Sequence, residues 1–239
     1  MQQVLGIMYN ALLQDEDCQV LELCKKAGLD FVQTIYRSGS MTCIRDECLG
    51  GNYGIKVIKK FIDMGVDMNE AVVKGRTPAN IVASLQKRTM FSREKDDYFE
   101  KAAEFFSKES MEQLDNNGTS AIHYAAKNEH LEMLQVMIDK GVDVNHADND
   151  GNTALILNAK NNCYKGVIKE LIKAGADVNA YDKLGNSALY YALKYGDLES
   201  SRFMIKKGAD FNHANNEGVT PMEVAVENGY DSIIELMYE

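Results

Sequence analysis

The sequence predicts an all-α solenoid, a stack of short helix–turn–helix units, because two repeated motifs share one period. An Asp-x-x-Gly turn motif, once with Asn in place of Asp, recurs every 33 or 34 residues and ends at Gly118, Gly151, Gly185 and Gly218. A second motif, Gly-Val/Ala-Asp-Val/Phe-Asn, keeps the same spacing at residues 141–145, 175–179 and 208–212. A period of this length is typical of helical repeat proteins, in which each unit buries its apolar face against its neighbours.

The first helix of each unit is expected directly after the turn motif. A Ser or Thr there can cap a helix, because its side-chain oxygen accepts hydrogen bonds from backbone N–H groups that lack a partner within the helix. The next residue is Ala or Pro, which suits the first helical position. These pairs are Thr77–Pro78, Ser120–Ala121, Thr153–Ala154, Ser187–Ala188 and Thr220–Pro221.

The second helix of a unit follows after a short turn, as in residues 131–140. Leu134, Met137 and Ile138 lie three and four residues apart, which places them on one apolar face. Gly141 then stands where a left-handed residue can end the helix. One unit is therefore turn, helix, turn and helix.

Residues 1–114 follow the pattern less closely than residues 115–239. Residues 75–84 open a unit whose second helix is expected late, at 96–110, so that Gly75 and Gly118 lie 43 residues apart. The extra residues near 85–95 predict an elongated region between two helices. Residues 17–27 and 55–64 are interpreted as second helices of earlier, degenerate units in one continuous solenoid.

These repeated residues resemble the ankyrin repeat, whose pattern is roughly D-x-x-G-x-T-P-L-H-x-A-A, a second helix and G-A-D-V-N. The match is close over 115–229, where His123 falls on the family's histidine, whereas Asn158 replaces an alanine and Tyr190 replaces the histidine. The resemblance implies an all-α ankyrin-repeat solenoid of about seven units including both caps. Residues 218–239 resemble a C-terminal cap.

The composition argues against several classes of protein. The chain has 26 Lys and Arg against 36 Asp and Glu, a net charge of −10, which disfavours nucleic acid as a partner and favours a soluble monomer. No apolar run has the roughly 18–20 residues of a membrane-spanning helix, so no membrane partner is expected. A secretory signal would require Lys or Arg near the N-terminus, but the first basic residue is Lys25. We expect a cytoplasmic location, with export by a non-Sec route left open, and the Asn-, Lys- and Tyr-rich composition favours a bacterial source.

No catalytic, metal or cofactor site is expected. The five cysteines form no Cys-x-x-Cys motif. The resemblance implies that His123 and His130 brace the repeat, and His146 and His213 stand at equivalent turn positions two repeats apart. The sequence therefore predicts a non-enzymatic protein that needs no cofactor.

The resemblance implies that a partner protein, whose identity the sequence does not give, binds to the turn tips and the concave surface of the inner helices. Residues there that the scaffold does not dictate are the candidate contacts: Lys127, Asn128, Asp150, Asn152, Lys160, Asn161, Tyr181, Leu184, Asn186, Lys194 and Tyr195.

Two groups within this set have open alternatives. The lysines at 127, 160 and 194 share one repeat position and could meet an acidic partner, or could merely complement the negative ends of helix dipoles. The Tyr and Leu residues at 181–195 could anchor a partner, or the tyrosines at 190 and 191 could pack between repeats and leave only Tyr195 exposed. The basic residues near 85–95 are a third candidate surface.

Protein–protein interaction is thus the expected function. An exported effector or a toxin-immunity protein could use the same surface. A structural spacer, a small-molecule binder or an enzyme is less favoured.

Overall fold

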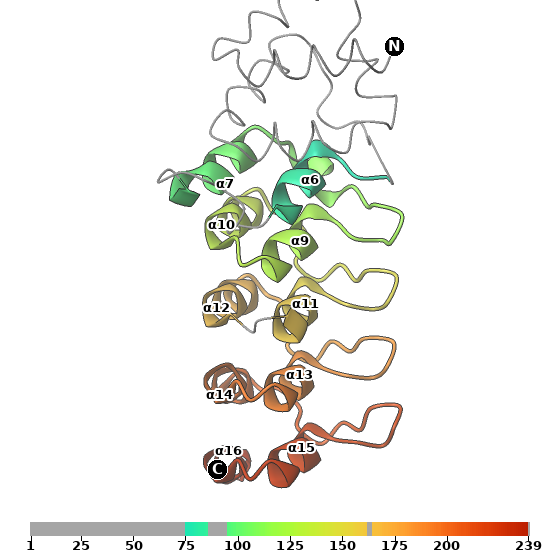
Figure 1. Ribbon diagram of the computed structural model, residues 1–239, viewed down its shortest axis with the longest axis vertical. Coiled ribbons are helices and arrows are strands. Elements are labelled where there is room, and N and C mark those ends of the chain that lie inside the picture. The colour runs from blue at the N-terminus through green and yellow to red at the C-terminus, as the bar shows by residue number, and fades with distance from the viewer. Residues whose placement is uncertain (1–74, 86–94, 162–163, 239) are drawn as a thin grey trace, which may run out of the picture.

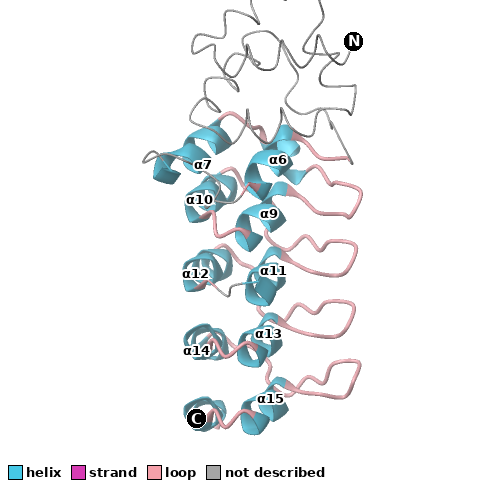
Figure 2. Cartoon of the chain, in the orientation of Figure 1, coloured by secondary structure: helices cyan, strands magenta, loops and turns pink. Residues whose placement is uncertain are grey.

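The computed structural model describes residues 75–85, 95–161 and 164–238. Their helices stack in two columns beside a row of projecting turns, and Figure 2 draws no strand in these ranges. The inner column, next to the turns, consists of α6 (Pro78–Ser84), α9 (Ala121–Lys127), α11 (Ala154–Asn161), α13 (Ala188–Lys194) and α15 (Pro221–Glu227). The outer column consists of α7 (Lys95–Glu104), α10 (Leu131–Asp139), α12 (Lys165–Lys173), α14 (Leu198–Lys206) and α16 (Asp231–Met237) (Figure 1). The expected ankyrin-type solenoid is confirmed.

The inner helices begin where the Ser/Thr-Pro/Ala pairs predict. The hydroxyl oxygen of Thr77 accepts a hydrogen bond from the Asn80 N–H at 3.2 Å. Ser187 and Thr220 cap α13 and α15 in the same way, with distances of 3.2 and 3.1 Å. Each cap satisfies a backbone donor that the helix leaves without a partner.

The core runs between the two columns. Inner helices contribute small side chains such as Ala125, Ala126 and Ala159, all fully buried, so neighbouring helices approach closely. Outer helices contribute larger ones such as Leu134 and Leu171. Because each unit completes the core of the next, the core is continuous along the stack.

The turns are joined to one another by a ladder of backbone hydrogen bonds. The N–H groups of Asn149, Lys183 and Asn216 donate to carbonyl oxygens of the preceding turn, each at 2.9 Å. Gly151 permits this approach, because its φ is 81° and a Cβ there would lie 2.9 Å from the Lys183 nitrogen. The turns therefore form a connected row.

The expectation of one helix over 96–110 is wrong. The chain forms two helices there, α7 and the short α8 (Lys108–Glu112), because Ser107 caps a new N-terminus by accepting from the Ser110 N–H at 3.1 Å. The end of α7 is held from the next unit. The Lys140 ammonium donates to the carbonyls of Ala103, Glu104 and Phe106 at 3.1, 2.9 and 2.6 Å.

Several sequence expectations lie outside the described residues. They are the two earliest units, at 17–27 and 55–64, most of the region at 85–95, and all five cysteines. No helix among the residues that the structure describes is long and apolar enough to cross a membrane.

Candidate functional site

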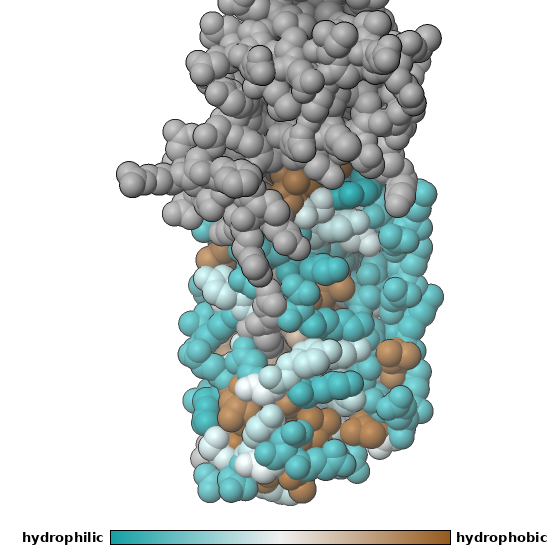
Figure 3. Space-filling model, viewed as in Figure 1, coloured by the Kyte–Doolittle hydropathy of each residue, from teal (hydrophilic) through white to brown (hydrophobic). Residues whose placement is uncertain are grey.

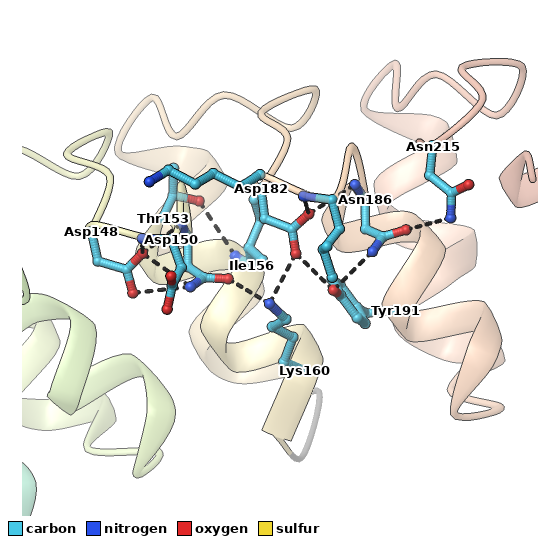
Figure 4. Close-up of polar contacts among 12 residues, drawn as sticks. Asp148, Asp150, Thr153, Ile156, Lys160, Asp182, Asn186, Tyr191 and Asn215 are labelled. Carbon is cyan, nitrogen blue, oxygen red and sulfur yellow. Dashed lines mark hydrogen bonds and ion pairs between the residues drawn. The ribbon is translucent and has the colours of Figure 1, made fainter. Parts of the chain in front are cut away.

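A buried carboxylate joins two successive repeats on the inner side of the stack. Asp182 begins its turn and lies in contact with α11 and α13, which the close-up in Figure 4 shows. One of its oxygens accepts from the N–H groups of Leu184 and Asn186, each at 2.9 Å. The other accepts from the Tyr191 hydroxyl at 2.7 Å and from the Lys160 ammonium of the preceding repeat at 2.9 Å.

These contacts shift the protonation of all three side chains. Burial alone would raise the pKa of Asp182, but hydrogen bonds from Tyr191 and Lys160 outweigh burial and lower this pKa below its usual value. Burial likewise opposes the charged form of Lys160, yet its bond to Asp182 raises the pKa. Burial and Asp182 together raise the pKa of Tyr191. The carboxylate and the ammonium are therefore both charged at neutral pH.

The network holds an exposed tyrosine in place. The ring of Tyr191 is only 5% exposed and carries the Lys160 ammonium 4.8 Å from its centre. Tyr195 stacks on Tyr191, with the two ring centroids 6.3 Å apart, and Tyr195 is 59% exposed. The exposed Tyr195 ring thus packs on a ring that is buried and hydrogen-bonded to Asp182 and Asn186.

A second large apolar residue lies at the tip of the same repeat. Leu184 is 60% exposed, although its N–H is fixed by Asp182. The face in Figure 3 is mainly hydrophilic, with separate hydrophobic patches on the described part of the chain. Leu184 and Tyr195 are therefore two large, exposed side chains of the same repeat.

The other aromatic residues of this repeat serve the scaffold. Tyr190 and Tyr191 are buried, as one of the two sequence alternatives stated. Tyr181 is partly exposed and stacks on His213 with ring centres 3.8 Å apart. Of the four tyrosines between residues 181 and 195, Tyr195 is the most exposed, at 59%.

The three lysines expected to form one row differ in their surroundings. Lys127 and Lys194 are exposed, and the Lys194 ammonium lies 5.6 Å from the centre of the Tyr190 ring. Lys160 turns inward instead, and donates to Asn152 at 2.6 Å as well as to Asp182. The expected row therefore consists of two exposed lysines with an ion-paired, partly buried lysine between them.

Asn152 and Asn186, both predicted as partner contacts, are only 5% and 6% exposed. The Asn152 side-chain nitrogen donates to both oxygens of Asp148 at 3.0 Å, and the Asn186 side chain bonds Tyr191 and Asn215. They hold the scaffold and cannot reach a partner protein. Their position directly after the turn glycine, next to the helix cap, is the sequence signal for this role.

The remaining predicted contacts stay accessible. Asp150 is exposed and takes part in the ladder only through its backbone. Asn128 and Asn161 each donate a side-chain N–H to a carbonyl of the preceding repeat, at 3.0 and 2.9 Å, while Asn161 remains exposed. These asparagines brace the ends of the inner helices.

Two histidines have structural partners. The His123 ring accepts from the Ser120 N–H at 3.2 Å and donates to the His146 carbonyl at 3.0 Å. Burial lowers the pKa of His123, so the ring is neutral near pH 7. The His130 ring lies 2.6 Å from the Leu85 carbonyl. Among the described residues, no three His, Cys, Asp or Glu side chains are grouped to hold a metal ion.

The family comparison agrees with this architecture. A family model described as ankyrin repeats (3 copies) matches residues 90–182 and 158–239. The chain belongs to the ankyrin repeat family. Ankyrin repeats are generally protein–protein interaction modules, and the family is typically non-enzymatic. No curated protein matches the chain.

Proposed function

We propose that this ankyrin-repeat protein binds a segment of a partner protein across the turn tips and inner helices, with Leu184 and Tyr195 as its anchors. The observation that carries the proposal is the 59% exposure of Tyr195 on the buried, doubly bonded Tyr191. A pre-oriented aromatic side chain loses little conformational freedom on binding, and tyrosines are enriched among the residues that dominate interface energies.

Polar groups around the anchors would orient the partner. Lys127 and Lys194 are exposed on the inner helices, Asp150 is exposed in the turn before α11, and Asn161 is exposed at the end of α11. Because neither of these lysines is held by an ion pair within the described residues, both are available to carboxylates of a partner. Such contacts add orientation and association rate more than affinity.

The proposal is tested by capture from lysate of the source cells, followed by a titration with the purified partner. We expect L184A/Y195A to weaken binding about tenfold or more, because central apolar anchors carry most of the energy of an interface. The matched control L114A/Y238A removes the same two residue types, which are 42% and 79% exposed elsewhere. Equal affinity of both double variants would refute the placement of the anchors.

A cytoplasmic location and a monomeric state belong to the same proposal. The net charge of −10 supports both solubility and separation of copies. Light scattering coupled to size-exclusion chromatography tests the monomer, since a concentration-dependent mass would contradict it.

A further inference from the structure

The outer helices α12 and α14 carry basic residues at equivalent positions of successive repeats. Lys169 corresponds to Arg202, and Lys173 to Lys206, each 33 residues further along the chain. Within each helix the two residues are four apart and therefore neighbours on one face. The helices lie next to each other in the outer column (Figure 1). The four side chains form an array of about 6 Å by about 10 Å.

Most of these charges are not neutralised. Among the residues that the structure describes, Lys169, Arg202, Lys206 and the adjoining Lys207 have no carboxylate within ion-pair distance. Arg202 donates to the neutral hydroxyl of Ser232, at 3.2 Å. Lys173 pairs with Glu170 at 2.6 Å. An excess of positive charge is therefore concentrated here, in a chain whose net charge is −10.

An aromatic ring lies among the ammonium groups. Phe203 is partly buried, and the Lys169 and Lys207 ammoniums lie 6.0 and 5.8 Å from its centre. These distances are near the outer limit for a cation–π contact, so the ring attracts the two ammonium groups only weakly. We call Lys169, Lys173, Arg202, Phe203, Lys206 and Lys207 the outer basic surface.

The outer basic surface ends at both neighbouring helices. In α10 the residue equivalent to Lys173 and Lys206 is Asp139. In α16 the residue equivalent to Lys169 and Arg202 is Glu235. Each helix of nine residues is about 13 Å long. A long polyanion or a plane of anionic lipids would extend past the surface onto these carboxylates and be repelled. A short acidic peptide would not.

We propose that the outer basic surface binds a short acidic segment of a partner protein, with carboxylates on the Lys and Arg side chains and an apolar side chain against Phe203. This site lies on the outer column, away from the turn tips and inner helices that carry the proposed function. It would give the repeat stack a second contact with a partner, independent of Leu184 and Tyr195.

The test uses the full chain and a fluorescein-labelled peptide that alternates glutamate with glycine around one phenylalanine. We expect binding by fluorescence polarisation that weakens between about 50 and about 200 mM salt, because added ions screen exposed charges. The peptide with glutamine in place of glutamate is expected to bind about tenfold more weakly or worse. R202E/K206E should lose about tenfold or more in affinity for the glutamate peptide.

The matched control is K101E/K108E, which makes the same change of charge at two exposed lysines of α7 and α8, outside both proposed surfaces. It should bind the glutamate peptide within about twofold of the unmodified chain if α12 and α14 hold the peptide. Equal losses in the two double variants, no binding of the glutamate peptide, or equal binding of the glutamine peptide would each overturn the proposal. Tighter binding of duplex DNA or of phosphatidylserine vesicles than of the peptide would overturn the class of partner.

Discussion

Replacing Asp182 by Ala tests whether one buried carboxylate fastens two repeats together. The substitution removes the acceptor for two turn N–H groups, for the Tyr191 hydroxyl and for the Lys160 ammonium. Each neutral hydrogen bond contributes about 1 kcal/mol net and a charged one about 1.5–3 kcal/mol. Water can replace part of these bonds, because the Lys160 side chain is 29% exposed. We expect D182A to lower the free energy of unfolding by about 3–5 kcal/mol.

The assay is urea unfolding followed by circular dichroism, with two companion variants. D182N keeps an oxygen for the turn but loses the charge that faces Lys160, so we expect a cost of about 1–2 kcal/mol. D150A removes an exposed Asp whose side chain has no bond to another described residue, and should cost less than about 0.5 kcal/mol. A cost of D182A no larger than that of D150A would refute the reasoning.

The same carboxylate predicts a dependence on pH. The pKa of Asp182 is lower in the folded chain than its ordinary value, so folding favours the ionised form. Its contribution is therefore complete above the unfolded pKa of about 3.9 and is lost as the pH falls through the lower, folded value. The stability gap between the original chain and D182A should narrow in this acidic range, and a constant gap would contradict the assignment.

Three further outcomes are expected. Burial lowers the pKa of His123, so the folded state favours the neutral ring; stability is highest above the unfolded pKa of about 6.5 and falls as the pH drops below it. The melting temperature of the original chain should therefore fall between about pH 7.5 and 5.5, and that of H123Q should fall less. Glu129 has a φ of 61° at the position that Gly196 and Gly229 occupy in the last two repeats. E129G should therefore be neutral or stabilise by up to about 1 kcal/mol in urea, whereas G196A should destabilise by about 1–2 kcal/mol. K140M removes three hydrogen bonds to the end of α7, and should speed amide hydrogen exchange in α7 more than in α14.

The regular part of the fold could be predicted because its signals are local and repeated. Ser187 and Thr220 cap helices where the sequence places them, and Gly141 ends α10 with a φ of 74°. The break between α7 and α8 was not predicted from the sequence, because the cap at Ser107 lies inside a run that contains no Gly or Pro to mark a helix end. The carbonyl groups at the end of α7 bond Lys140, which belongs to the next repeat. A contact between repeats of this kind cannot be read from a local pattern.

The candidate surface could be predicted only in part, for the same reason. Leu184 and Tyr195 are exposed as expected, because nothing in the following repeat covers them. Lys160 shares its repeat position with Lys127 and Lys194, yet it turns inward because Asp182 and Tyr191 of the next repeat offer it an acceptor and a ring. The outer basic surface did have a signal, the spacing of 33 residues between Lys169 and Arg202.

The backbone ladder between turns has a consequence for how such a protein can change its partner. Lys183 and Asn216 join their turns to the preceding ones through backbone N–H groups, at 2.9 Å in both cases. Since almost any residue supplies that donor, side chains at the tips can be exchanged while the row of turns keeps its spacing. Specificity can therefore evolve at the tips with little cost in stability, and new binding variants can be selected from libraries at these positions without redesign of the core.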